Sequence, residues 1–350
     1  MGKNKNFKFD VIIGNPPYQD KTIGNNDTYA PPVYNQFIDE SYEIADKVEL
    51  IHPARFLFNA GSTPKAWNEK MLNDSHFKVL EYEEHSGKVF PNTDIKGGIV
   101  ISYHDKSKEF GAIKIFTPYS ELNNILKKVL NAKGFKEFSE IVISSYAYHF
   151  LKILYDDFPE AKGSLSKGHE FDFKSNVFEK MPEVFAEKRP DDENNYIRVL
   201  GRVNNKRIYR FIAKKYVNEV SNLHHYKVFM SGATGTGEYG EAITVPIIGY
   251  PNDAATETFL SIGCFDSEIE SENVIKYIKT KFCRALYGTL KRTQANTPGK
   301  WKHVPLQDFS SNSDIDWSKS IHEIGLQLYK KYGLSQDEIQ FIESHVKEMA

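Results

Sequence analysis

The segment FDVIIGNPPYQ, residues 9–19, carries the strongest structural signal in the chain. Its apolar, β-branched start predicts a short buried strand of a parallel sheet, and Asn15-Pro16-Pro17-Tyr18 follows at once. The two prolines fix φ and remove two N–H donors, so the turn is stiff and the Pro16 carbonyl stays outside any helix. That carbonyl, the Asn15 side-chain oxygen and the flat Tyr18 ring together suit the holding of an amino group for alkylation.

The hydrophobic pattern around this segment predicts a sheet with helices between its strands. Strand-like and helix-like stretches alternate, which indicates α/β architecture for residues 1–108. The predicted elements are a strand at 7–13, a helix at 33–46, a strand at 47–51, a helix at 62–74, and strands at 77–84 and 97–105.

The rest of the chain has a different pattern. Short apolar runs alternate with polar turns from residue 109 to 310, which predicts mixed strands around one long helix. We expect Ser271 to cap that helix and an apolar stripe to run from Ile275 to Leu290. Two more helix patterns, 317–332 and 335–348, flank Gly333. The predicted segments are therefore 1–108, 109–310 and 311–350.

Composition limits the class of protein. Of the 350 residues, 40% are hydrophobic and 26% are charged, which argues against wholesale disorder and a fibrous repeat. No apolar run approaches the roughly 18–20 residues of a membrane span. The two cysteines form no metal-ligand pattern. We therefore predict a cytoplasmic protein with no metal site and no membrane partner.

The net charge of −2 conceals two basic stretches. Residues 198–227 hold eight Lys and Arg against one acid, and residues 276–303 hold eight with no acid. Aromatic residues are interleaved with them, and this composition suits the backbone of a nucleic acid. We predict a DNA-binding surface, for which the candidate contacts are Arg202, Lys206, Arg207, Lys291 and Arg292.

FDVIIGNPPYQ resembles the catalytic motif of adenine-N6 DNA methyltransferases, specifically the gamma class of restriction–modification systems. The resemblance continues through PVYNQFIDESYEIAD (32–46) and LIHPARFLFNAG (50–61) to KVFPNTDIKGGIVISYHDK (88–106). It implies a partial Rossmann-like methyltransferase sheet that lacks its first strands. An α+β DNA target-recognition domain and a helical C-terminal segment are expected to follow.

The resemblance also implies roles for individual residues. Asn15 and the Pro16 carbonyl would bind the adenine N6 amine, within the motif that Pro17 and Tyr18 complete. Tyr18 would stack on one face of the base and Phe90 on the other. The base must leave the duplex to reach such a pocket. The methyl donor would be S-adenosyl-L-methionine. For Tyr34, Phe37 and Arg55 we expect packing or support.

The cofactor-binding residues stay unassigned. The family's glycine-rich loop precedes its catalytic motif, whereas only eight residues precede Phe9 here. GTGEYG (235–240) matches GxGxxG, but a strand-like run follows it, so we interpret it as a turn. We expect a sheet with an exposed edge and weak or no binding of S-adenosyl-L-methionine by the isolated chain. The expected partners are double-stranded DNA and an N-terminal methyltransferase half or companion restriction–modification subunit.

Alternatives to site-specific DNA adenine methylation stay open. A protein glutamine methyltransferase shares the NPPY motif and holds an amide nitrogen. A non-catalytic DNA-specificity module would fit the missing cofactor half. A nuclease would need a metal site. Glu160-Ala161-Lys162 matches the pattern ExK, but no predicted strand lies beside it to form such a site.

Overall fold

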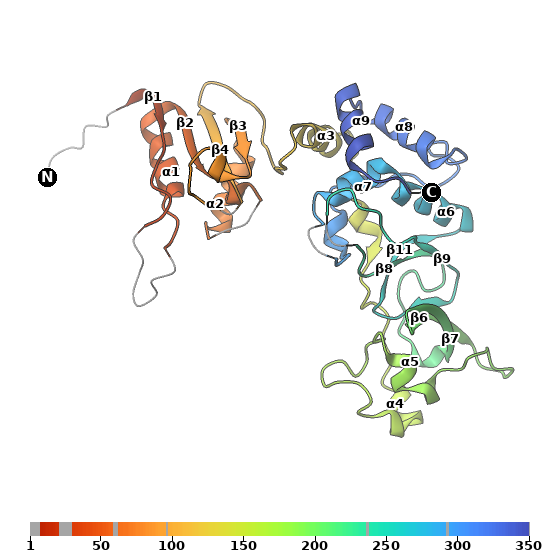
Figure 1. The fold of residues 1–350 in the computed structure, drawn as a ribbon. Helices are drawn as coiled ribbons and strands as arrows, with labels where there is room; N and C mark the ends of the chain where they lie inside the picture. Colours follow the sequence, from red (N-terminus) through yellow and green to blue (C-terminus); the bar gives the residue numbers. More distant parts are fainter. Residues whose placement is uncertain are drawn as a thin grey trace. The chain divides into compact units, whose positions relative to one another are not determined.

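The computed structural model describes residues 8–20, 30–58, 62–95, 97–235, 238–291 and 294–349. The chain is mixed α/β and divides into two compact units, Met1–Lys127 and Lys128–Ala350 (Figure 1). The domain boundaries predicted from the sequence, at residues 108 and 310, refer to functional domains and remain predictions. Among the described helices, none combines the length and the apolar character that crossing a lipid bilayer requires.

The first unit is built on a four-stranded sheet with the order β1-β2-β4-β3. β1 and β2 pair in parallel, and β4 runs antiparallel to both of its neighbours. The predicted order of strands and helices is confirmed. The elements are β1 (Phe9–Gly14), α1 (Tyr34–Ile44), β2 (Ala45–Pro53), α2 (Lys65–Asn73), β3 (Phe77–Glu83) and β4 (Ile99–Asp105), with 3-10 turns at Arg55–Phe58 and Ser86–Lys88.

The core of the first unit lies between this sheet and its two helices. Ile38 of α1 and Met71 of α2 are fully buried in one cluster with Phe77 and Val100 of the sheet. Trp67 Nε1 of α2 also donates to Asp39 Oδ2 of α1 at 3.1 Å, which joins the two helices.

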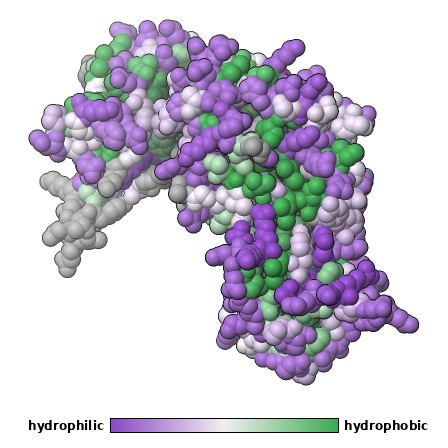
Figure 2. All heavy atoms as spheres, turned by 45° about the vertical axis from the view of Figure 1, so that its right-hand side comes forward, coloured by the Kyte–Doolittle hydropathy of each residue, from purple (hydrophilic) through white to green (hydrophobic). Residues whose placement is uncertain are grey.

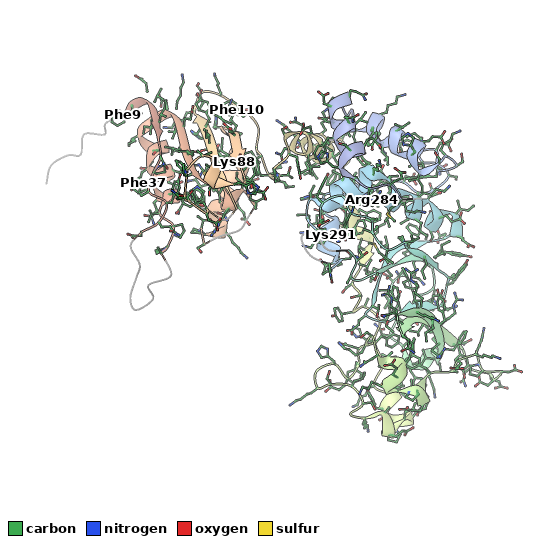
Figure 3. The ribbon with its side chains drawn as sticks, viewed as in Figure 1. Phe9, Phe37, Lys88, Phe110, Arg284 and Lys291 are labelled. Atoms are coloured by element: carbon green, nitrogen blue, oxygen red, sulfur yellow. The ribbon has the colours of Figure 1, made fainter. Side chains whose placement is uncertain are left out.

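Burial of β1 differs from the prediction. Among the described residues, β1 pairs with β2 alone, so it is an edge strand. Ile12 packs against the core cluster, whereas Phe9, Val11 and Ile13 are 50%, 49% and 74% exposed (Figure 3 labels Phe9). Alternation along a strand sends these three side chains to the opposite face. The prediction of a buried strand is therefore wrong for this chain, while the expected exposed edge is present.

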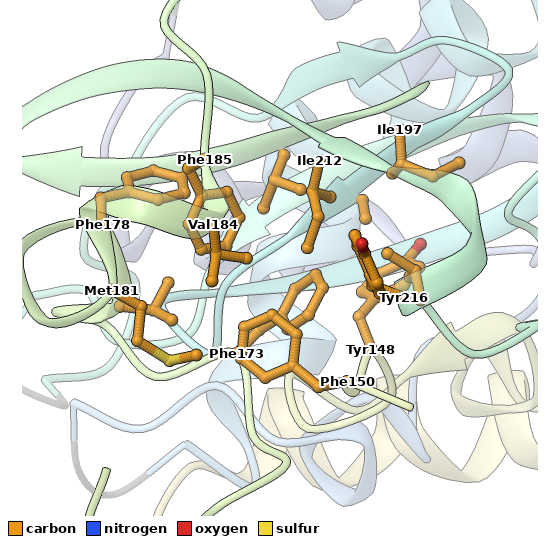
Figure 4. Packing of buried hydrophobic residues seen from close by; sticks show 14 of the residues in the cluster. Tyr148, Phe150, Phe173, Phe178, Met181, Val184, Phe185, Ile197, Ile212 and Tyr216 are labelled. Atoms are coloured by element: carbon orange, nitrogen blue, oxygen red, sulfur yellow. The ribbon is translucent and has the colours of Figure 1, made fainter. Parts of the chain in front are cut away.

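The second unit contains two sheets, with the orders β10-β6-β7 and β5-β11-β8-β9. An aromatic-rich core that includes Phe150, Phe173 and Phe185 packs beneath β6 and β7 (Figure 4). The strands are β5 (Val142–Ile143), β6 (Tyr196–Val203), β7 (Lys206–Ala213), β8 (Tyr226–Ser231), β9 (Ile247–Gly249), β10 (Asp253–Ala255) and β11 (Phe259–Phe265).

Helices complete the two units. The boundary between the units, at Lys127, lies within α3. Hydrophilic side chains cover most of the surface seen in Figure 2, with apolar patches between them. The helices are α3 (Ser120–Leu130), α4 (Leu154–Asp157), α5 (Val177–Lys180), α6 (Glu268–Lys279), α7 (Lys281–Gly288), α8 (Ile321–Lys331) and α9 (Gln336–His345), with 3-10 turns at Phe138–Ile141, Pro159–Ala161, Pro182–Val184, Lys214–Tyr216 and Pro298–Trp301.

The long helix predicted after Ser271 is two helices in the structure. Ser267 caps α6, accepting from the Glu270 N–H at 3.3 Å, and Ser271 lies inside that helix. Thr280 adopts an extended conformation, which ends α6, and its hydroxyl accepts from the Cys283 N–H at 3.2 Å to start α7. The periodic stripe continues across the break, which explains why the sequence pattern did not reveal it.

The two C-terminal helices are confirmed with shorter bounds. Ser320 and Ser335 cap α8 and α9 through reciprocal bonds with the glutamate three residues later. Gly333, which separates them, has a φ of 61°, a conformation that glycine adopts without a steric penalty. The helices pack with α6 and α7, so they belong to the second unit.

Candidate active site and basic surface

A pocket of about 400 Å³ lies at the carboxyl ends of β1 and β2. Gly14 pairs with Leu50 in the parallel register, so the segments after both strands emerge at one edge of the sheet. Open α/β sheets bind ligands at this edge, and the volume falls within the usual range for ligand pockets. The wall consists of Tyr18, Gln19, Ala30, Pro32, Tyr34, Pro53, Arg55, Ser62, Asp94 and Ile95.

The Asn-Pro-Pro-Tyr loop is accessible and anchored at its end. Asn15 and Pro17 are exposed, and Pro16 and Tyr18 are half-buried. The Tyr18 carbonyl accepts from the Val33 N–H at 3.2 Å, which ties the loop to the start of α1. Among the described residues, the Pro16 carbonyl accepts no backbone hydrogen bond. The predicted acceptor on the backbone is thus uncommitted.

The Tyr18 hydroxyl is a second uncommitted group. It is buried, and no hydrogen bond of ordinary geometry reaches it within the described part of the chain. Burial raises the pKa of the Tyr18 phenol, and a weaker interaction with the Asn15 side chain acts in the opposite direction. Tyr18 therefore presents a neutral ring to the pocket.

Behind Tyr18, the pocket wall contains Tyr34, which forms an uncharged aromatic pair with His52. Tyr34 is 4% exposed and stacks on His52, with ring centroids 5.7 Å apart and planes 11° apart. Burial raises the pKa of Tyr34 to about 12 and lowers the pKa of His52 to about 4. His52 Nε2 lies 2.7 Å from Ser102 Oγ, which fixes the ring. Such a wall suits a flat, neutral ligand.

The turn after β3 supplies the opposite part of the wall. Buried Ser86 accepts from the Ile95 N–H at 2.8 Å and donates to the Thr93 carbonyl at 3.1 Å. These bonds hold Asp94 and Ile95 at the pocket. Phe90, the predicted second stacking residue, is half-buried in the same turn but does not line the pocket.

Arg55 lies in the pocket wall, where sequence reasoning expected only support. Two glycines allow the chain to pass close behind it. A Cβ on Gly97, whose φ is 84°, would lie 2.8 Å from Arg55 Cγ, and one on Gly98 would lie 2.5 Å from the Glu83 carbonyl. The sequence held a usable signal, because HPAR directly follows the second parallel strand. By contrast, Phe37 does not pack as expected and is 43% exposed on α1 (Figure 3).

Three of the predicted DNA contacts lie together on the β6–β7 hairpin. Arg202 and Arg207 are directly opposite each other in the ladder, and both are half-buried. Lys206 is exposed beside them. The hairpin thus presents part of the first basic stretch as a local cluster.

Lys291, in the second basic stretch, is inside the fold (Figure 3). It is 2% exposed, pairs with the Glu241 carboxylate and donates to the Thr234 carbonyl at 2.9 Å. Its ammonium is already neutralised and removed from solvent, so we withdraw Lys291 as a DNA contact. Arg292 lies outside the described residues.

The GTGEYG match is a packed turn rather than a phosphate loop in its described part. A Cβ on Gly240 would lie 2.0 Å from the His345 carbonyl, and the next regular element is β9 rather than a helix. Thr236 and Gly237 lie outside the described residues. Glu160-Ala161-Lys162 falls at a 3-10 turn, and no cluster of three metal-ligating side chains occurs in the described ranges.

Comparison with known proteins identifies what the first unit resembles. The model of the Eco57I restriction-modification methylase family matches residues 2–90. An uncharacterized adenine-specific methylase of Mycoplasma pneumoniae is 32% identical over 95 residues, which are 27% of this chain and 22% of that protein. The resemblance to adenine methyltransferases of restriction–modification systems is confirmed for this N-terminal part. The match spans only about a fifth of the relative's length.

Two solved structures match 96% of this chain at low similarity. The type IIG restriction endonuclease BpuSI is 10% identical, with 54% of its chain covered and a TM-score of 0.28. The type IIL restriction-modification enzyme MmeI, in complex with DNA, is 9% identical, with 56% covered and a TM-score of 0.32. Similarity at this level carries no argument about the arrangement of this chain.

Proposed function

We propose that this chain holds the target base and binds DNA for site-specific adenine-N6 methylation in a restriction–modification system. One observation carries the proposal. Within the segment that matches the methylase family, an NPPY loop whose Pro16 carbonyl accepts no backbone hydrogen bond among the described residues leads into a pocket lined by Tyr18, Tyr34 and Arg55 at the ends of two parallel strands. The first unit is then the second part of a Rossmann-like methyltransferase sheet.

In this proposal the Asn15 side-chain oxygen and the Pro16 carbonyl accept the two hydrogens of the adenine N6 amine. The two bonds orient the nitrogen and expose its lone pair for alkylation. Tyr18 stacks on the everted base, and this contact offsets part of the cost of unstacking it from the duplex. We retain Phe90 as the second stacking residue, because it lies in the same segment as Asp94 and Ile95 of the pocket wall.

S-adenosyl-L-methionine would supply the methyl group. The described residues of the first unit include no glycine-rich loop between a strand and a helix, so we assign none of them to the cofactor. We propose that a methyltransferase half outside the described residues brings the cofactor-binding elements. The exposed apolar side of β1 and its free edge support docking at Phe9, Val11 and Ile13.

The docking proposal has a direct test. Val11→Asp replaces an exposed side chain, so it should change the stability of the isolated chain by no more than about 0.5 kcal/mol. It should nevertheless weaken capture of a polypeptide that carries the cofactor-binding half, measured by pull-down. Equal capture by the wild-type chain and the variant would show that docking does not use this side of β1.

The function is tested with Asn15→Ala. The chain and a polypeptide that carries the cofactor-binding half are incubated with S-adenosyl-L-methionine and duplex DNA, and N6-methyladenine is measured by mass spectrometry. Loss of one of two acceptors should lower the methylation rate by roughly 100–1,000-fold. Because Asn15 is exposed and contacts to phosphates dominate affinity for a duplex, the duplex affinity should change less than twofold.

Two controls separate the alternatives. Gln19→Ala, at the same pocket wall, should lower the rate less than Asn15→Ala does. Methyl transfer to a glutamine-containing peptide with no transfer to DNA would identify a protein methyltransferase instead. Duplex binding without any transfer would identify a specificity module.

A further inference from the structure

The β6–β7 hairpin holds two arginines directly against each other. Arg202 and Arg207 are opposite partners in the antiparallel ladder, on either side of the turn at Asn204-Asn205. The turn residues have φ values of 49° and 62°, as a tight two-residue hairpin turn requires. Opposite side chains share one face with their Cβ atoms about 4.5–5.5 Å apart, and like charges in this position destabilise a sheet.

The other two arginines of this hairpin are neutralised within the protein. Arg198 Nη2 lies 2.6 Å from Asp253 Oδ2, and Arg210 Nη2 lies 2.8 Å from Glu187 Oε1. Among the described residues, no carboxylate lies within ion-pair distance of Arg202 or Arg207. The fold thus neutralises two arginines and leaves the facing pair without a counter-charge.

The facing pair is held in place although it lacks an acid. Both guanidinium carbons lie over the Phe259 ring, 5.5 Å from its centroid for Arg202 and 5.8 Å for Arg207. Arg207 Nη2 donates to the Val245 carbonyl at 2.9 Å. Burial, and secondarily the charge of Arg202, lowers the pKa of Arg207.

One donor of the pair is left without a partner. Arg202 Nε is buried and forms no hydrogen bond in the described part of the chain. A buried donor without an acceptor costs about 1–3 kcal/mol, and more for a charged group. The repulsion between the two guanidinium groups would be relieved by one anion with several oxygens bound at their accessible ends.

We infer that Arg202 and Arg207 form one anion site that grips a single phosphodiester of the DNA backbone. Two guanidinium planes offer paired N–H donors, which match phosphate oxygens better than ammonium groups do. Lys206, exposed at the hairpin tip, adds positive charge on the approach. The inference rests on the proposed function only for the identity of the polymer, since an anion site exists with or without methyl transfer.

The anion site is tested first with inorganic phosphate, by thermal unfolding of the full chain in phosphate and in chloride at equal ionic strength. Phosphate stabilises proteins generally, so Arg210→Gln, on the other face of the same hairpin, is the matched control. The extra shift in Tm should be roughly 1–3 °C for the wild type and Arg210→Gln, and it should vanish in Arg202→Gln and Arg207→Gln. Equal shifts in all four proteins would overturn the site.

The second test asks whether DNA occupies the site. Duplex affinity is measured by fluorescence anisotropy as a function of salt. Loss of one phosphate contact lowers the slope of log K against log salt by about 0.9. Because the pair shares one phosphate, either arginine alone still neutralises it, so the double variant should lower the slope by about 0.9, each single variant should lower it by less, and Arg210→Gln should not lower it. An unchanged slope in the double variant, a loss of about 1.8 there or a loss confined to one DNA sequence would contradict the inference.

Discussion

The NPPY loop and the basic stretch 276–303 were both prominent in the sequence, yet the fold uses their polar groups in opposite ways. In the loop, among the described residues, the Pro16 carbonyl accepts no backbone hydrogen bond and the Tyr18 hydroxyl, at the pocket wall, makes none of ordinary geometry, whereas buried polar groups usually have internal partners. In the basic stretch, Lys291 pairs with Glu241, and Lys281 lies 2.8 Å from Glu343.

This difference distinguishes a candidate functional residue from a structural one. Linear charge counts ignore acids that tertiary structure brings from elsewhere, such as Glu343, which lies 62 residues beyond Lys281. A polar group that the fold leaves without a partner remains able to bind a ligand. The comparison can be tested by removing groups of each kind and measuring stability.

The largest effect is expected at Lys291. Lys291→Ala removes the buried ammonium that pairs with Glu241 and donates to the Thr234 carbonyl, so the free energy of unfolding should fall by about 3–5 kcal/mol. Chemical denaturation followed by fluorescence measures the change. Lys302→Ala is the matched control, because Lys302 is exposed in the same stretch and should change stability by less than about 0.5 kcal/mol. Similar losses of stability for both variants would contradict the proposal that Lys291 is a structural residue and Lys302 is not.

Acid sensitivity should be the next largest effect, and it involves one buried histidine from each region. His52 lies behind the pocket and His303 ends the basic stretch, and burial lowers the pKa of each to about 4. The unfolded chain takes up these protons below about pH 6.5, whereas the folded chain does so only near pH 4. Stability should therefore fall as the pH decreases through this window, by roughly 3 kcal/mol per histidine near pH 4.

Denaturation midpoints measured between pH 7.5 and 4.5 test this prediction. His52→Gln and His303→Gln should each flatten the pH dependence, since neither variant has a proton to bind at that position. Thr289, whose Oγ1 lies 2.7 Å from His303 Nδ1, and Ser102 remain available to a glutamine amide. An unchanged pH profile in both variants would show that other groups cause the acid sensitivity.

Local patterns predicted the fold of the first unit well. Every strand and helix expected between residues 7 and 105 is present, because each has an unambiguous period and clear turn residues. Burial of β1 was not predictable, since an apolar run looks the same whether or not another element covers it. The break at Thr280 was missed because α6 and α7 continue one apolar stripe.

The site was predictable only in part. A short motif located Asn15 and Tyr18 because the chemistry depends on adjacent residues. The rest of the wall comes from three separate segments, including Arg55 and Asp94, whose convergence depends on strand pairing and turn closure. Among the basic residues, Arg202 and Arg207 face each other because of the register of the hairpin, and the register cannot be predicted from composition.

The smallest expected change in stability distinguishes the hydroxyl groups of Tyr148 and Tyr18. Tyr148 donates to Asn222 Oδ1 at 2.8 Å, so Tyr148→Phe leaves a buried acceptor with one bond fewer and should cost about 1–2 kcal/mol. Tyr18→Phe removes a hydroxyl that forms no hydrogen bond of ordinary geometry within the described part of the chain, so stability should stay within about 0.5 kcal/mol of the wild type or rise. The phenylalanine ring should also preserve stacking on a base, whereas Tyr18→Ala should weaken base binding by about 1–3 kcal/mol. Denaturation measures the first pair, and affinity for a duplex with an unpaired adenine measures the second. A cost at Tyr18 as large as at Tyr148 would mean that the fold itself uses the Tyr18 hydroxyl, and the contrast between the two regions would fail at the residue nearest the pocket.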